Sequence, residues 1–276
     1  MMKERTLRVL EFTKIRDRLA SKAMTDMGRE RCEALVPSSN MTEIQRMQAE
    51  TEEATVILQY VGASPLVPFS DVRASLTLAE KGATLSPKAL LEVAALMQSA
   101  RAARKALDTE RDNTPILKEL AQRLSTLHNV EQDITNAIIS EDEIADRASN
   151  ELMDIRRHLR GANERIKEKL NQMIRSSAFQ KYLQDPIVTM RNDRYCLPVK
   201  AEYRGSVPGL VHDQSSTGAT LFIEPMAAVE MGNELKTWAA KEKQEIERIL
   251  SALSAEIAPY ADQLRETVET LAELDY

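Results

Sequence analysis

Two stretches of apolar residues with alternating three- and four-residue spacing constrain the fold of this chain more than any other feature. The first stretch consists of Leu152, Ile155, Leu159, Ala162, Ile166, Leu170 and Met173. The second consists of Leu235, Ile246, Ile249, Leu253, Ile257, Tyr260, Leu264, Val268 and Leu271; Glu242 interrupts it, and Pro259 is expected to kink the helix. This spacing gives each helix one apolar stripe, which must be buried against another element. We therefore predict two long helices that fold back on each other as an antiparallel coiled coil.

Residues 183–225 separate the two stretches and contain several helix-breaking prolines and glycines. In "RYCLPVKAEYR", apolar and polar residues alternate with the period of two that is typical of a half-buried strand. The runs "PGLVHD" and "ATLFIEP" are typical of short strands, and "QSSTG" between them has the small polar residues of a hairpin turn. We predict a small sheet at the tip of the helical arm.

The first 140 residues carry repeated start and stop signals of helices. Asn40 with Glu43 has the pattern of a capping box, Gly62 is a stop signal, and Ser86 followed by Pro87 is a start signal. Aromatic residues are only 4% of the chain, and the dominant residues are good helix formers. The predicted fold is mainly α: a helical bundle core (1–140), an outgoing lever helix (141–182), a small β-rich clamp (183–225) and a returning lever helix (226–276).

An equal count back from the tip gives a first register for the helix pair. It places Leu170 near Ala239 and Leu159 near Leu250. We predict that Leu159, Leu170 and Leu250 lie in the apolar seam.

Sequence motifs for catalysis are missing. Neither the Walker pattern nor G-x-G-x-x-G occurs, and the three histidines have no ligand spacing. Ser215 or Ser216 with His212 and Asp213 form a nominal catalytic set, but hydroxyls in a hairpin usually bond the turn backbone. We favour that role for the serines, and a surface position in a turn for His212. We predict no catalytic residue, no metal site and no cofactor in this chain, which is not expected to be an enzyme.

Charge and hydropathy restrict the class of protein to which the chain can belong. The formal net charge of −6 gives no general attraction to nucleic acid, so binding would need a local group of cations. No apolar run approaches the roughly 20 residues of a membrane span, and no leading signal segment is present. Two distant cysteines indicate a reducing compartment. We expect a cytoplasmic protein without membrane contact.

Two groups of cations are candidate phosphate contacts. The first, in the tip, consists of Arg191, Arg194, Lys200, Arg204 and His212. The second, on the outgoing helix, consists of Arg156, Arg160 and Lys167. Each group has a structural alternative, because tip cations can form a solvated sheet surface and helix cations can pair with glutamates of the returning helix. The residue pattern leaves both alternatives open.

Several segments of the chain carry a resemblance to a known family. They are "LEFTKIRDRLASKAMTDMG", "MQAETEEA", "KGATLS", "IRRHLR" and, most specifically, "VTMRNDRYCLPVKAEYRGSVPGLVHDQSSTGATLFIEP". Over essentially its whole length the chain resembles the second bacterial type of MutS protein. It departs from the family at Asp193, where glycine is usual, at Cys196, where an aliphatic residue is usual, and at 231–233, where Leu-Asn-Asn is usual.

The resemblance implies the core, lever and clamp of a MutS-like ATPase, without a mismatch-reading domain. It implies that the intact protein is a dimeric hydrolase, with ATP and magnesium in an ATPase domain and usually an Smr nuclease domain, both beyond Tyr276. The implied partners are branched DNA, in restraint of recombination, and the rRNA of stalled or collided ribosomes, whose subunits it separates. This chain would grip the substrate. The alternative is a coiled-coil arm for protein–protein contact or dimerisation, without direct contact to nucleic acid.

Overall fold

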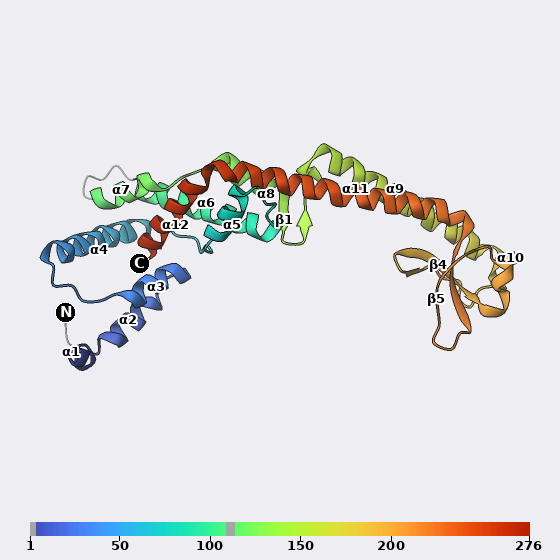
Figure 1. Cartoon of the computed structure of the whole chain (residues 1–276), viewed down its shortest axis with the longest axis horizontal. Helices are drawn as coiled ribbons and strands as arrows, with labels where there is room; N and C mark the ends of the chain where they lie inside the picture. Colours follow the sequence, from blue (N-terminus) through green and yellow to red (C-terminus); the bar gives the residue numbers. More distant parts are fainter. Residues whose placement is uncertain (1–3, 109–113) are drawn as a thin grey trace. The chain divides into compact units, whose positions relative to one another are not determined.

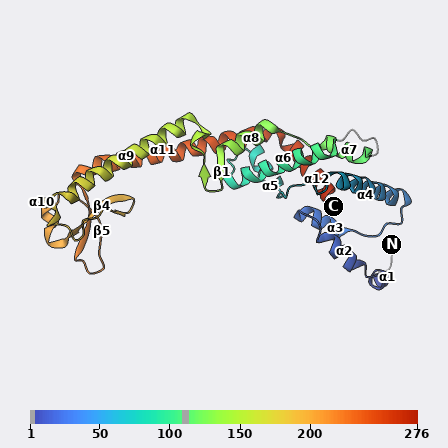
Figure 2. The same ribbon diagram turned by 180° about the vertical axis from the view of Figure 1, so that it is seen from behind.

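The computed structural model describes residues 4–108 and 114–276, and the chain divides into two compact units. The first unit combines residues 1–145 with 249–276, and the second comprises residues 146–248. Both units are rich in helix, and the second contains a four-stranded antiparallel sheet (Figures 1 and 2). The mainly helical class with a small sheet is confirmed, whereas the four-part division of the chain stays a prediction.

The first unit is a set of helices with one two-stranded ribbon. Its elements are α1 (Glu4–Val9), α2 (Phe12–Ala20), α3 (Asp26–Ala34), α4 (Met41–Val61), α5 (Arg73–Glu80), α6 (Pro87–Leu107), α7 (Pro115–Arg123), α8 (His128–Ala137), β1 (Ile138–Ser140), β2 (Glu143–Ile144), the end of α11 (Met226–Ile257), η3 (Ala258–Tyr260) and α12 (Ala261–Asp275). Asn40 caps α4, which ends before Gly62 at φ 80°, and Ser86 caps α6, as the sequence predicts. Helices α6 and α12 contribute the fully buried side chains Leu90, Val93, Leu96, Met97, Leu264, Val268 and Leu271.

Within the described residues, no helix is long and apolar enough to cross a membrane.

The second unit contains a pair of antiparallel helices. After η1 (Asp146–Ala148), helix α9 (Asn150–Arg175) runs beside α11 (Met226–Ile257), whose residues up to Arg248 belong to this unit. The Arg165 guanidinium lies 3.0 Å from the Glu234 carboxylate, and the rings of His158 and Trp238 stack with centroids 4.4 Å apart. Residue numbers that rise on one helix as they fall on the other show that the helices run antiparallel.

The register of the helix pair differs from the one expected. Leu170 is fully buried and packs in a cluster with Ala228, Met231 and Leu235, closer to the start of α11 than the expected neighbour Ala239. The difference arises because α9 ends at Arg175 rather than near residue 182.

The early end of α9 has a local cause. Ser176 leaves the helical conformation at ψ 120°, and the chain continues as the short helix α10 (Ser177–Gln180). Leu159 is half-buried in the second unit, and Leu250 is half-buried in the first. His158, the neighbour of Leu159, stacks on Trp238, well before Leu250 on the same helix, so the register of the second unit does not support the expected pairing of Leu159 with Leu250.

The sheet of the second unit has the strand order β3-β4-β6-β5, with all neighbours antiparallel. Its strands are β3 (Thr189–Arg191), β4 (Arg194–Lys200), β5 (Gly209–Gln214) and β6 (Thr220–Pro225). Leu197, Val199 and Ile223 share one face and pack with Ile166 and Leu170 of α9. This face forms the core of the unit.

The strand predicted over 194–204 is shorter than expected. It stops at Lys200, and residues 201–206 form the 3-10 helix η2 (Ala201–Ser206). All residues from Cys196 to Val199 are buried, so the alternation of residue types does not produce an exposed face there. Both faces of β4 are covered, one by the apolar core and the other by a cluster of charged side chains described below.

The turn between β3 and β4 carries backbone strain. Asn192 and Asp193 have φ of 50° and 57°, and two successive residues with positive φ are typical of a type I′ hairpin turn. Replacing Asp193 with glycine is expected to raise the free energy of unfolding by about 0.5–1 kcal/mol, because glycine adopts this conformation without a steric cost. Denaturant unfolding measures the effect.

Asn192→Gly is the matched control, since the Asn192 Nδ2 donates a hydrogen bond of 3.0 Å to the His212 carbonyl oxygen, which glycine would lose. A higher free energy of unfolding for both glycine variants, or for neither, would contradict this account of the turn.

Candidate nucleic-acid interface

A buried carboxylate organises the second face of the sheet. Glu224 is fully buried; its Oε1 lies 3.1 Å from Arg194 Nη1, and its Oε2 lies 2.8 Å from His212 Nε2. Arg194 also donates a hydrogen bond of 2.8 Å from Nη2 to Asn233 Oδ1 on α11. A buried carboxylate needs such partners because its desolvation cost is high. Strands β4, β5 and β6 and helix α11 therefore meet at one ionic cluster.

Gly232 makes room for this cluster on α11. A Cβ atom at this position would lie 2.5 Å from Glu224 Oε1 and 2.9 Å from Arg194 Nη1. The ion pair thus packs directly against helix backbone.

The ionic cluster changes the expected roles of two tip residues. Strand alternation predicts an outward-pointing Arg194, but only 15% of its side chain is exposed. His212 was expected in a surface turn, but it lies in strand β5 with its ring against Glu224. Strand alternation placed Arg194 on the correct face but could not show that Glu224 covers that face.

Arg191 is also engaged within the unit. Its Nε lies 3.2 Å from Asp213 Oδ2, and its guanidinium lies 4.1 Å from the centroid of the Phe222 ring. Arg191 and Arg194 are directly opposite each other in the β3–β4 pair, where like charges repel. Each arginine has its own carboxylate, which offsets that repulsion.

Two of the three helix cations pair with carboxylates. Arg156 lies 2.6 Å from both Asp146 Oδ1 and Glu242 Oε1, and Arg160 lies 3.1 Å from Asp146 Oδ2. Hydrogen bonds from Arg156 and then Arg160 lower the pKa of Asp146. These contacts favour internal pairing for Arg156 and Arg160. Lys167 is exposed, 6.0 Å from the Tyr195 ring centroid.

Three cations of the tip have no carboxylate within ion-pair distance in the part of the chain that the structure describes: Lys181, Lys200 and Arg204. Lys200 Nζ donates to the Lys181 carbonyl oxygen at 3.5 Å, and Arg204 donates to the carbonyl oxygens of Val207 and Gly209 at 3.5 and 3.2 Å. In the described part of the chain, no ion pair offsets the positive charge of these three side chains. The exposed Glu202 lies in the same 3-10 helix as Arg204 and reduces the local excess of positive charge.

Two tyrosines lie among these cations. Lys181 Nζ is 4.8 Å from the centroid of the Tyr182 ring, which lies 5.4 Å from that of Tyr203. The Lys200 backbone N–H donates to the Tyr182 carbonyl oxygen at 3.0 Å and joins the two segments. We call Lys181, Lys200, Arg204, Tyr182 and Tyr203 the tyrosine–cation cluster. Sequence reasoning missed Lys181 and Tyr182 because it assigned them to the outgoing helix.

The nominal catalytic set is not assembled. Ser215 Oγ accepts a hydrogen bond of 3.1 Å from the Thr220 backbone N–H, which is the turn role favoured by the sequence. His212 contacts Glu224, and Asp213 contacts Arg191. Within residues 4–108 and 114–276, no group of three or more His, Cys, Asp or Glu side chains is placed to hold a metal ion.

Cys196 lies beneath the ionic cluster, fully buried. Burial, and then the negative charge of Glu224, raise the pKa of the Cys196 thiol from 9.0 to about 11. The unfolded chain loses this proton near pH 9 and the folded chain keeps it up to about pH 11. The free energy of unfolding should therefore fall with rising pH across this window, by up to about 1.4 kcal/mol per pH unit.

Cys196→Val is the comparison for this pH dependence, because valine retains the apolar contacts without a titrating group. Urea unfolding between pH 8 and pH 10.5 should show a shallower decline for the variant. If the free energy of unfolding fell equally with pH for both proteins, Cys196 would not contribute to the pH dependence.

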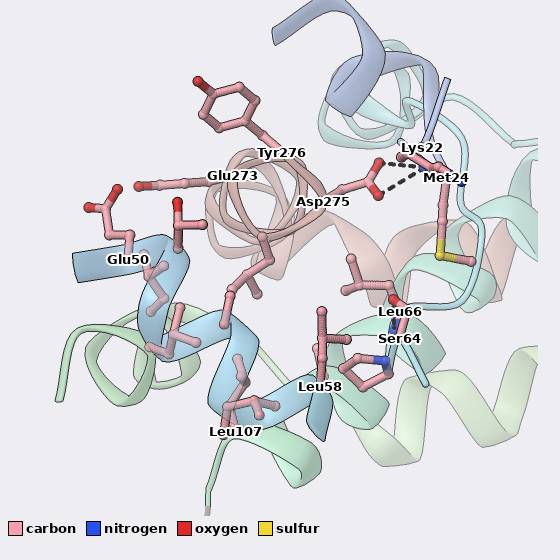
Figure 3. A pocket seen from close by; sticks show the side chains of 18 of the residues that line it. Lys22, Met24, Glu50, Leu58, Ser64, Leu66, Leu107, Glu273, Asp275 and Tyr276 are labelled. Carbon is pink, nitrogen blue, oxygen red and sulfur yellow. Dashed lines mark hydrogen bonds between the residues drawn. The ribbon is translucent and has the colours of Figure 1, made fainter. Parts of the chain in front are cut away.

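The first unit holds a cavity of about 560 Å³ (Figure 3). Leu58, Leu66 and Leu107 line it, with Glu50 and Glu273 among the few charged residues. At its edge the Asp275 carboxylate accepts a hydrogen bond of 2.9 Å from the Met24 backbone N–H. Its walls offer mainly apolar contacts, and this chemistry does not indicate one class of ligand.

The fold is that of a mainly helical protein in which a pair of helices bears a small sheet and the tyrosine–cation cluster. No family model matches the chain. Proteins named endonuclease MutS2 are similar to it along its whole length: 45% identical over 280 residues in Acetivibrio thermocellus, 46% over 275 in Symbiobacterium thermophilum and 47% over 277 in Alkaliphilus oremlandii. The chain spans about a third of these relatives, 35%, 34% and 35% of their lengths. The chain is therefore similar to a segment of these MutS2 proteins.

Proposed function

We propose that the second unit grips nucleic acid for a MutS2-like protein, with the tyrosine–cation cluster as the contact surface. One observation carries the proposal: Lys181, Lys200 and Arg204 have no carboxylate partner in the described ranges, although the chain has a formal net charge of −6. A group of cations without such partners is the local surface that phosphate binding requires.

The proposed substrates are branched DNA and the rRNA of stalled or collided ribosomes, as the family resemblance implies. Both present a phosphate backbone, which the cations would contact irrespective of sequence. In the whole protein we propose a cytoplasmic homodimer in which this chain is the N-terminal core, lever and clamp. An ATPase domain with ATP and magnesium, and a nuclease domain, would supply the enzymatic activity.

A second candidate function is a protein–protein or dimerisation arm. The pairing of Arg156 with Asp146 and Glu242 favours it, because cations engaged in this way contribute little to phosphate binding. Under this alternative the helix pair would be a structural spacer.

The salt dependence of binding separates the two functions. For a four-way DNA junction and for an rRNA fragment, log affinity should fall linearly with log salt between 50 and 200 mM, with a slope of about 0.9 per phosphate contact on duplex DNA. Three contacts give a slope of about 2 to 3. Affinity that is independent of salt, or self-association without nucleic-acid binding, would favour the arm.

A further inference from the structure

We propose that the tyrosine–cation cluster binds unpaired nucleotides, with a base stacked on Tyr182 or Tyr203 and the adjoining phosphates held by Lys181 and Lys200. The inference rests on the proposed function and specifies its substrate class. It concerns the junctions, loops and single strands in which bases are free to stack.

Aromatic and apolar neighbours hold the two tyrosine rings in place. Tyr182 contacts Phe179 edge-on, with centroids 5.9 Å apart and planes at 88°, and it meets Tyr203 at an angle of 58°. Both tyrosines pack against the apolar core that contains Leu183 and Val199, yet both remain half-buried. Each ring therefore has a fixed apolar side and a part open to solvent, which suits an aromatic side chain at an interface.

Two lysines lie close to Tyr182. Lys181 Nζ lies over Tyr182 at 4.8 Å, and Lys200 reaches the carbonyl oxygen of Lys181. Aromatic rings beside a cationic track are the arrangement with which proteins bind single strands, because the rings take the bases and the cations take the phosphates. The cluster has both components, rings and cations, within residues 181–182 and 200–204.

Duplex nucleic acid fits this arrangement less well. Bases in a duplex are already stacked on their neighbours, so a tyrosine ring reaches only base edges and backbone. A ring gains stacking energy only where a base is splayed out. Branched DNA and folded rRNA share this feature, so one surface would serve both proposed substrates.

Two double variants test the stacking. Tyr182→Leu with Tyr203→Leu keeps the apolar contacts and removes the rings; Tyr182→Phe with Tyr203→Phe keeps the rings. For a 20-nucleotide poly(dT) strand, the leucine variant should bind about 5- to 150-fold more weakly than wild type, the range for loss of one stacked base. The phenylalanine variant should bind as tightly as wild type.

A blunt, fully paired duplex of equal length is the second probe. Its affinity for the leucine variant should change less than about twofold, with the same salt slope, since the phosphate contacts remain. Tyr60→Leu, at a side chain 61% exposed on α4, controls for the general loss of a surface tyrosine. Melting temperature and circular dichroism establish that each variant is folded, and Tyr203→Leu alone replaces the double variant if that one unfolds.

If the leucine variant lost affinity for poly(dT) and for the duplex equally, the stacking proposal would be overturned, but the proposed nucleic-acid binding function would stand. A phenylalanine variant as weak as the leucine variant would also overturn it. Wild-type protein that binds neither probe in a salt-dependent manner would instead reject the proposed function itself.

Discussion

Replacing Lys181, Lys200 and Arg204 together with glutamate is expected to weaken binding to a DNA junction by about two to three orders of magnitude at low salt. Each substitution removes one phosphate contact and adds a repulsive charge. The slope of log affinity against log salt should fall by about 2 to 3, because each lost contact removes about 0.9. Folding should change little, since Lys181 and Arg204 are exposed, Lys200 is half-buried outside the apolar core, and surface charges contribute little to stability.

The control for this triple variant carries the same charge change elsewhere. Lys81, Lys105 and Lys243 are exposed and, within the described residues, lie outside every ion pair. Their replacement with glutamate should lower the affinity far less, through net charge alone. Equal effects of the two triple variants would show that the tip is not the gripping surface, and would direct attention to Lys167.

Glu224→Gln should lower the free energy of unfolding of the second unit by about 3–5 kcal/mol, the largest stability effect that we predict. The substitution removes the negative charge that compensates Arg194, whose side chain is only 15% exposed. An uncompensated buried guanidinium is costly because neither water nor a carboxylate solvates it. Trp238, the single tryptophan, lies in the second unit, so its fluorescence reports the unfolding of this unit in urea.

Asp213→Asn is the matched control for Glu224→Gln. It breaks the Arg191–Asp213 pair, in which 39% and 47% of the two side chains are exposed, and should cost no more than about 1 kcal/mol. Adding Arg194→Met to Glu224→Gln should restore part of the lost stability, because the unpaired charge is then removed. Similar losses of stability for Glu224→Gln and Asp213→Asn would mean that burial does not determine how much the ionic cluster contributes to stability.

The helices of the first unit were predictable because their signals are local. Asn40 and Ser86 each bond backbone N–H groups two or three residues away, so a short sequence window contains the whole cause. The existence of α9 and α11 also followed from their apolar stripes. Their register did not, since it depends on where α9 stops, and Ser176 is a weaker signal than Pro186, the first strong helix breaker beyond it.

The arrangement of the tip could not be read from strand periodicity. Arg194 and Glu224 are 30 residues apart, and nothing in the spacing of either strand shows that they meet. The same limitation hid the tyrosine–cation cluster, whose members come from 181–182 and 200–204. The backbone hydrogen bond between Lys200 and Tyr182 brings these two segments together.

Strand β5 lies at the edge of the sheet, and Leu210 and Val211 on it are 49% and 43% exposed. An open, apolar edge invites strand addition from other molecules and hence aggregation. Here Asn192 donates to the His212 carbonyl oxygen and Arg204 to that of Gly209, so side chains from other segments occupy acceptors that an incoming strand would need. Loss of these two side chains would make the tip prone to edge-to-edge aggregation at high protein concentration.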